Sequence, residues 1–176
     1  MLFQNKQSGF SLIELMVVLT IVGIFAMVAV PSYQSTIQNG RLTSETNELI
    51  GALYYARSEA VKRRADVQVC KSDDGITCDP GLNWQDGWLV WSDADGDSAV
   101  DQAEVLRVGT EAEGQISIFA TMNDVTFSLR GMSSISGTLQ LCDSRGVNEA
   151  TAIVISPSGR VRSSDTTHIG GDLTCS

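Results

Sequence analysis

A single glutamate at the start of a long apolar segment is the side chain in this sequence that most needs a chemical explanation. Glu14 is the only ionisable residue between Phe10 and Val30, and from Leu15 to Val30 the only polar side chain is Thr20. As a helix, such a segment can cross a hydrocarbon core of about 30 Å, which needs roughly 20 residues. An unpaired carboxylate in that environment is costly, so Glu14 is predicted to have a functional partner.

A run of carboxylates forms the second candidate site. Its acidic residues fall at positions 1, 3, 5, 9 and 12 of a near match to a calcium-binding loop, and they are Asp93, Asp95, Asp97, Asp101 and Glu104. Ser98 stands where that loop needs glycine, and the flanking segments resemble strands, whereas the calcium motif needs helices. We therefore expect a solvated β-hairpin tip, with a calcium site as the alternative.

Two arginines near the end of the chain form the third candidate site. Arg160 and Arg162 are two residues apart on an expected strand, so both side chains should point to one face, where Arg145 and His168 could join them. Paired arginines can bind phosphates, which makes nucleic-acid binding an alternative. The preferred interpretation is two solvated or acid-paired arginines, because the acidic residues Asp143, Glu149 and Asp165 would weaken a positive field.

The four cysteines favour disulfide bonds over a metal site. No C-x-x-C spacing occurs, and His168 is the single histidine, so zinc is not expected. Three pairings are possible for four cysteines. We favour the pairs nearest in sequence, Cys70 with Cys78 and Cys142 with Cys175.

Composition and motifs argue against catalysis and against general polyanion binding. The net charge is −9 over 176 residues, so any nucleic-acid contact would need a local basic patch. No phosphate-cradling glycine loop is visible, and one histidine without a positioned nucleophile and acid is not a catalytic arrangement. We predict that the protein is not an enzyme and that it uses no cofactor or metal.

The N-terminus resembles the class III leader of type IV pilins and pseudopilins. Residues 1–9 are a short polar leader, followed by the sequence Gly9-Phe10-Ser11-Leu12-Ile13-Glu14 and the apolar segment. The resemblance implies that a prepilin peptidase cleaves after Gly9 and methylates Phe10. It also implies that Glu14, fifth in the mature chain, pairs with the amino group of Phe10 on a neighbouring subunit.

Later segments are similar to the GspH/FimT/FimU branch of that family. They are the helical segment 48–60 with its L-x-x-A-R-S-E-A pattern, the tryptophan-containing segment 84–91, and the segment 155–162, which ends in Gly159-Arg160-Val161-Arg162. In FimT-like members such a Gly-Arg-x-Arg element is implicated in DNA uptake, but it also occurs in relatives without that role. A DNA-binding minor pilin therefore remains the alternative function.

Residue periodicity predicts the elements that position these sites. Beyond Pro31, which should kink the helix, the residues Leu42, Leu49, Leu53, Ala56 and Ala60 mark one apolar helical face. The polar face should carry Arg41, Glu45, Glu48, Arg57 and Glu59. The helix should run from Phe10 to about Arg64.

A period of two then predicts eight short strands near residues 67–70, 87–91, 105–108, 116–119, 125–129, 138–142, 152–156 and 160–163. The tryptophans Trp84, Trp88 and Trp91 should pack in the core and the hairpins. The expected fold is α+β, with a long N-terminal helix packed on an antiparallel sheet or two small sheets.

The predicted organisation is a leader over residues 1–9, a transmembrane and assembly helix over 10–32, its amphipathic continuation over 33–65, and a periplasmic antiparallel β domain over 66–176. We expect a single-pass inner-membrane protein that assembles with other pilins or pseudopilins and an inner-membrane assembly platform. The expected function is a pseudopilin or minor pilin, a structural subunit of a type II secretion pseudopilus or of a type IV pilus tip.

Overall fold

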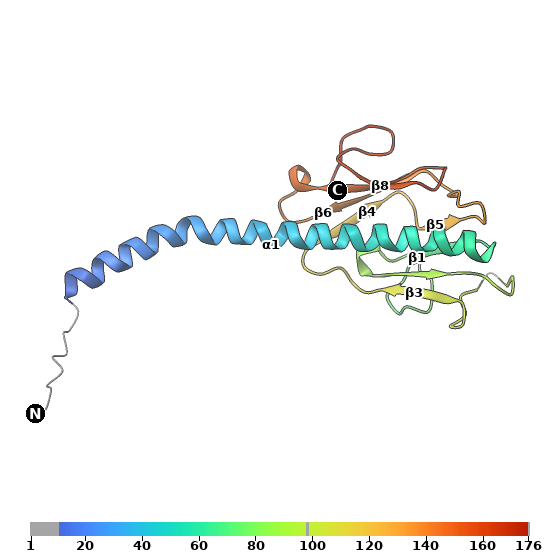
Figure 1. Cartoon of the computed structure of the whole chain (residues 1–176), viewed down its shortest axis with the longest axis horizontal. Coiled ribbons are helices and arrows are strands. Elements are labelled where there is room, and N and C mark those ends of the chain that lie inside the picture. Colours follow the sequence, from blue (N-terminus) through green and yellow to red (C-terminus); the bar gives the residue numbers. More distant parts are fainter. Residues whose placement is uncertain (1–10, 98, 176) are drawn as a thin grey trace, which may run out of the picture. The chain divides into compact units, whose positions relative to one another are not determined.

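The computed structural model describes residues 11–97 and 99–175, and in this part of the chain one long helix precedes eight strands. The helix α1 spans Leu12–Arg63 and continues through Pro31 without ending (Figure 1). Its bounds agree with the predicted helix to within two residues. Phe10, the predicted first helical residue, lies outside the described residues.

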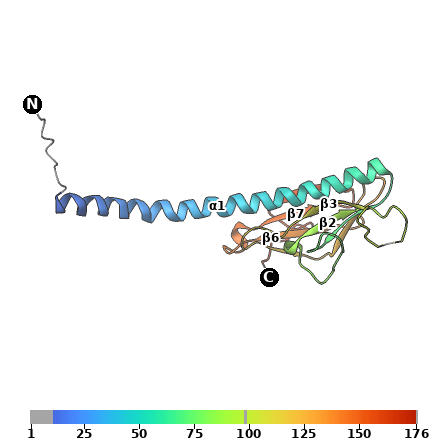
Figure 2. The ribbon, with the colours of Figure 1, turned by 90° about the horizontal axis from the view of Figure 1, so that it is seen from below.

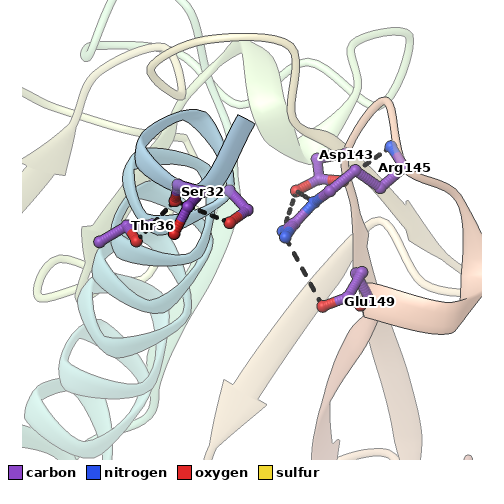
Figure 3. A network of polar contacts seen from close by, with 6 residues as sticks. Ser32, Thr36, Asp143, Arg145 and Glu149 are labelled. Carbon is purple, nitrogen blue, oxygen red and sulfur yellow. Dashed lines mark hydrogen bonds and ion pairs between the residues drawn. The ribbon is translucent and has the colours of Figure 1, made fainter. Parts of the chain in front are cut away.

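Hydroxyl side chains bond to the backbone of α1 just after the proline. Pro31 has no N–H, so it cannot donate to the carbonyl one turn earlier. The Oγ of Ser35 and the Oγ1 of Thr36 both lie 2.9 Å from the carbonyl oxygen of Ser32 and donate to it. Figure 3 shows Thr36 beside Ser32. Ser and Thr side chains inside a helix commonly bond in this way to a carbonyl of the preceding turn.

Eight strands follow α1, each within two residues of its predicted position. They are β1 Val67–Lys71, β2 Trp88–Trp91, β3 Val105–Gly109, β4 Ser117–Ala120, β5 Asp124–Phe127, β6 Gly137–Cys142, β7 Thr151–Ile155 and β8 Val161–Ser164. Short 3₁₀ helices, η1 Trp84–Asp86 and η2 Val147–Glu149, lie between strands. All strand pairs are antiparallel, as the short connections predict.

The strands form two sheets of four. One sheet has the order β3-β2-β1-β5 and the other β4-β6-β7-β8. Alternate residues of both sheets point into one core with the second half of α1, for example Val67 and Val69 in β1 and Ile153 and Ile155 in β7. Figure 2 shows the strands of both sheets on one side of this part of the helix.

The apolar face predicted for the helix is buried in this core. Leu42, Leu49, Leu53, Ala56 and Ala60 are all at most 6% exposed. The three tryptophans, Trp84, Trp88 and Trp91, are buried as predicted.

One residue of the predicted polar face is an exception. Glu59 is only 6% exposed. Its carboxylate lies 3.0 Å from Lys62 Nζ and 2.6 Å from Arg63 Nε, so the cluster at the helix end supplies the charge partners that let a carboxylate sit at the edge of the core. These hydrogen bonds also lower the pKa of Glu59.

The chain divides into two compact units, Met1–Asn39 and Gly40–Ser176. In the first unit, the described residues belong to α1, apart from Ser11, and the apolar segment makes up most of them. The second unit combines the remaining part of α1 with both sheets. The second half of the helix therefore belongs to the same compact unit as the β domain.

Candidate functional site

The carboxylate of Glu14 lies in the first turn of α1, where it is exposed. Negative charge at this position interacts favourably with the positive end of the helix dipole. Glu14 is the only charged side chain between Ser11 and Gly40. Among the described residues of this segment, Thr20 satisfies its hydroxyl internally by donating to the carbonyl of Met16 at 2.8 Å.

The apolar side chains around Glu14 are also exposed. Large hydrophobic residues from Leu12 to Val30 are about half to four-fifths exposed, for example Phe25 at 71% and Met27 at 81%. By length and composition this part of α1 can cross a membrane. A helix that is apolar all round needs lipid or other helices as its surroundings. The two processing residues predicted next to it, Gly9 and Phe10, lie outside the described residues.

The predicted acidic hairpin tip connects β2 to β3. These strands pair antiparallel, so the flanks are strands and not the helices of a calcium-binding motif. Carboxylate oxygens of Asp93, Asp95 and Asp97 lie within 4.8 Å of one another.

The other acidic residues of the hairpin behave differently. Glu104 is buried, and its carboxylate accepts hydrogen bonds from the backbone N–H groups of Ala94, Asp95 and Asp101. Asp101 is exposed and lies outside the group of three. The carboxylate of Glu104 thus closes the loop by binding its backbone N–H groups, and a calcium site stays the untested alternative to a solvated hairpin tip.

The predicted arginine pair lies at the start of β8, an edge strand of its sheet. Arg162 is in β8 opposite Val154, whereas Arg160 precedes the strand, which begins at Val161. Both arginines are exposed, and neither forms an ion pair with a carboxylate of the described residues.

The two other residues considered for this site have their own partners. The guanidinium of Arg145 binds Asp143 with Nε 3.0 Å from a carboxylate oxygen, and its Nη1 lies 3.6 Å from Glu149 (Figure 3). The bond to Arg145 lowers the pKa of Asp143 and raises that of Arg145. The imidazole Nδ1 of His168 lies 3.0 Å from the hydroxyl of Thr138.

A contact that the periodicity did not predict involves Arg57, from the helical segment, and the turn before β8. Arg57 Nε donates to the carbonyl of Gly131 at 2.9 Å, and its Nη2 donates to the carbonyl of Ser158 at 3.1 Å. A Cβ on Gly159 would lie only 1.9 Å from the oxygen of Gly131. The pattern placed Arg57 on a solvated helical face. Its two bonds link segments that are 74 and 101 residues away, and helical periodicity carries no signal for such partners.

Both disulfides join cysteines that are nearest in sequence. Cys70 in β1 is bonded to Cys78, and Cys142 at the end of β6 is bonded to Cys175 near the C-terminus. The first bond encloses the Asp73-Asp74-Gly75 turn. Backbone and hydroxyl donors there lower the pKa of Asp74. The second bond anchors the C-terminal segment to the sheet.

Comparison with known proteins places these features in a family. Residues 45–159 match the model of the type II transport protein GspH, and residues 4–30 match the prokaryotic N-terminal methylation motif. The first of these matches covers residues 45–63 of α1 and the β domain as far as residue 159.

Two curated relatives match less than half of this chain. The type IV major alpha-pilin of Moraxella bovis is 49% identical over 45 residues, which are 26% of this chain and 28% of the relative. The prepilin peptidase-dependent protein D of Escherichia coli K12 is 35% identical over 81 residues, 45% of this chain and 48% of that protein. The chain thus spans less than half of the length of these relatives.

A longer match supports the fold beyond the N-terminus. The fimbrial protein EcpC of Eikenella corrodens is 29% identical over 130 residues, covering 72% of this chain and 83% of that protein. The crystal structure of the type IV minor pilin FimU of Pseudomonas aeruginosa superimposes with a TM-score of 0.61 at 22% identity, over 79% of this chain and 98% of FimU. At that identity the match shows a shared pilin fold. The chain belongs to the GspH family and carries the N-terminal methylation motif of pilin-like proteins.

Proposed function

We propose that this protein is a structural subunit, a pseudopilin or minor pilin, which assembles into a filament through its N-terminal helix. The observation that carries the proposal is the exposed apolar segment of α1 with Glu14 as its single charge. Such a surface is unfavourable in water, and it is satisfied first by lipid and then by the helices of other subunits. A catalytic role is not part of the proposal, since the family consists of structural subunits.

Processing prepares the helix for assembly. In the proposed sequence a prepilin peptidase cleaves after Gly9, removes the leader 1–9 and methylates the new N-terminal Phe10. The segment 10–32 remains in the inner membrane, 33–65 continues the helix, and the β domain 66–176 lies in the periplasm. Two disulfides in that domain support this orientation, because such bonds persist in an oxidising compartment.

Glu14 is proposed to set the position of each subunit in the filament. In a helix bundle its carboxylate would pair with the cationic amino group of Phe10 on a neighbouring subunit. Bringing two opposite charges together removes the cost of leaving either one unpaired in an apolar environment. The helix–helix contacts supply area and the ion pair supplies the axial register. The same helix packing and ion pair would serve in a type II secretion pseudopilus or in a type IV pilus tip.

Replacement of Glu14 tests this function. Breaking a buried ion pair by removal of one partner costs about 3–5 kcal/mol, so Glu14→Ala should lower incorporation into filaments by about 100-fold or more. Membrane insertion should persist, because alanine makes the segment more apolar. Incorporation is measured by quantitative blotting of sheared or detergent-extracted filaments, with the membrane fraction measured in parallel.

Glu48→Ala is the matched control. Glu48 is an exposed carboxylate on the same helix, outside the apolar segment. Its removal should leave incorporation unchanged. Normal incorporation of the Glu14→Ala variant would refute the pairing of Glu14 with a neighbouring subunit.

A further inference from the structure

Two tight turns from distant parts of the chain lie against each other beside α1. The first, residues 128–132, is closed by the N–H of Gly131, which donates to the carbonyl of Ser128 at 2.7 Å. The second, residues 156–160, is closed by the N–H of Gly159, which donates to Ser156 at 2.8 Å. The N–H of Ser133 donates to the carbonyl of Pro157 at 3.1 Å and links them. We call residues 128–132 and 156–160 the double turn.

Arg57 and two glycines fix the geometry of the double turn. The guanidinium of Arg57 binds one carbonyl in each turn, those of Gly131 and Ser158. Gly131 and Gly159 have φ values of +71° and +72°, which favour glycine. The turns approach so closely at Gly159 that a Cβ there would collide with the oxygen of Gly131. Because α1 and the two turns constrain each other, the surface of the double turn is pre-organised.

Apolar side chains are exposed at this surface. Leu129 and Met132 in the first turn are each 50% exposed, and Val61 of α1 is 51% exposed. Val61 lies directly beside the same turn, since a Cβ on Gly131 would be 3.1 Å from its Cγ2. The three residues thus gather at one place, whereas scattered single apolar residues would need no explanation.

The charged residues of the double turn are arginines. Arg130 lies between Leu129 and Gly131, and Arg160 ends the second turn; both are exposed. The guanidinium of Arg57 donates to neutral carbonyls. No carboxylate of the described residues forms an ion pair with any of these three arginines. The double turn is therefore a basic surface on a chain whose net charge is −9.

We propose that the double turn, with Val61, docks an acidic and partly apolar surface of a neighbouring pilin-like subunit. This inference rests on the proposed function, and it adds the place on the β domain where contact occurs. Charge complementarity selects an acidic partner. Methionine and arginine are both enriched in protein interfaces relative to the rest of the surface, and this group combines Met132 with Arg130 and Arg160. Binding to a phosphate backbone depends on cations and gives no role to the half-exposed Leu129 and Met132.

Site-specific photo-crosslinking in the native host tests this surface. A photoreactive phenylalanine analogue replaces Leu129 in the full-length chain, and adducts are identified by mass spectrometry. The expected adduct is another pilin-like subunit, joined through a peptide that contains Asp or Glu. The same analogue at Ile169, which is 82% exposed, serves as the control position and should give at least fivefold less of this adduct.

Charge reversal tests the basic rim. The double substitution Arg130→Glu and Arg160→Glu should lower the adduct yield at position 129 at least fivefold, without lowering the thermal midpoint of the purified chain. Arg41→Glu is the matched control. Arg41 is an exposed arginine on α1, and at 1.5 Å per residue it lies about 24 Å along the helix from Arg57, which contacts the double turn. Its adduct yield should equal that of the unmodified chain. Equal yields from the double variant, or a main adduct with nucleic acid, lipid or a second copy of this chain, would overturn the proposal.

Failure of this inference can be separated from failure of the proposed function. If the chain enters filaments but position 129 gives no subunit adduct, the docking surface is wrong and the structural role stands. If the unmodified chain never enters filaments, the proposed function itself fails.

Discussion

Gly159 occupies a position where both backbone conformation and lack of space require glycine. Its φ is +72°, and a Cβ would lie 1.9 Å from the carbonyl oxygen of Gly131. That carbonyl also accepts the hydrogen bond of Arg57, so it is not free to move away. The glycine that precedes Arg160 thus has a structural reason independent of any ligand: it lets the turn before β8 approach the loop after β5.

Replacing Gly159 with alanine should therefore destabilise the fold by more than its φ angle explains. The left-handed conformation costs a residue with a Cβ about 1–2 kcal/mol, and the collision with Gly131 adds to it. Gly146→Ala is the matched control, because Gly146 has φ +82° and nothing within 4 Å of its Cβ position. By urea denaturation, the free energy of unfolding should fall at least twice as much for Gly159→Ala as for Gly146→Ala. Equal losses would show that the turns separate easily.

At the scale of single residues, the sequence predicted which side chains are buried better than it predicted which residues they bind. It placed Leu49 and Leu53 in the core because helical periodicity reports which face is apolar. It placed Arg57 and Glu59 on the solvated face. Glu59 is instead buried with Lys62 and Arg63, and Arg57 binds carbonyls of two distant turns. Partners as far along the chain as those of Arg57 leave no periodic signal. The partners of Glu59 lie three and four residues ahead on the same helix, a spacing that does bring side chains together, but it does not show that the carboxylate is buried.

At the scale of elements, the connection from β6 to β7 is held by an ion-pair network. Asp143 follows β6, its carboxylate binds the guanidinium and the backbone N–H of Arg145, and Arg145 also reaches Glu149 in η2. These bonds lower the pKa of Asp143 below its usual value. A lowered pKa in the folded state stabilises the fold above the unfolded pKa of about 4, and this stability is lost as pH falls through the folded value.

Arg145→Gln should lower the free energy of unfolding at pH 7 by about 1–3 kcal/mol, since hydrogen bonds between charged groups are lost. The difference in the free energy of unfolding between the parent protein and the variant should narrow as pH falls below about 4, because the stability from the lowered pKa of Asp143 is lost as its carboxylate becomes protonated. Urea titrations at several pH values measure this gap. Arg162→Gln, which removes an exposed arginine without an ion pair, should show no such change. If the difference in the free energy of unfolding between the parent and Arg145→Gln stayed constant down to pH 2, the stabilising contact between Arg145 and the Asp143 carboxylate would be contradicted.

The strands themselves were predictable because local signals specify them. Alternating residues such as Val67 and Val69 or Leu139 and Leu141 point into the core, and turn residues separate the segments. The order of strands was not predictable. β1 pairs with β5 as well as with its neighbour β2, and the chain forms two sheets of four strands. Such pairing depends on contacts between residues far apart in sequence, which local patterns do not encode.

At the scale of the whole molecule, the two units carry different tasks in the proposed function. The described part of the first unit is an apolar helix with one charge, suited to contacts that every pilin-like subunit can make. The second unit, Gly40–Ser176, presents surfaces particular to this chain, such as the double turn and the acidic β2–β3 hairpin. Assembly would thus depend on the first unit, and the choice of neighbours on the second.

The central claim is that the apolar helix stays with the protein after the leader is removed and then joins a filament. Intact-mass and N-terminal peptide mass spectrometry of the chain, purified from its native host together with detached filaments, tests it directly. The predicted result is a mature chain that begins with methylated Phe10, retains the whole apolar segment and co-purifies with other pilin-like subunits. A chain that keeps residues 1–9 in filaments, or one cut beyond the apolar segment, would contradict the account.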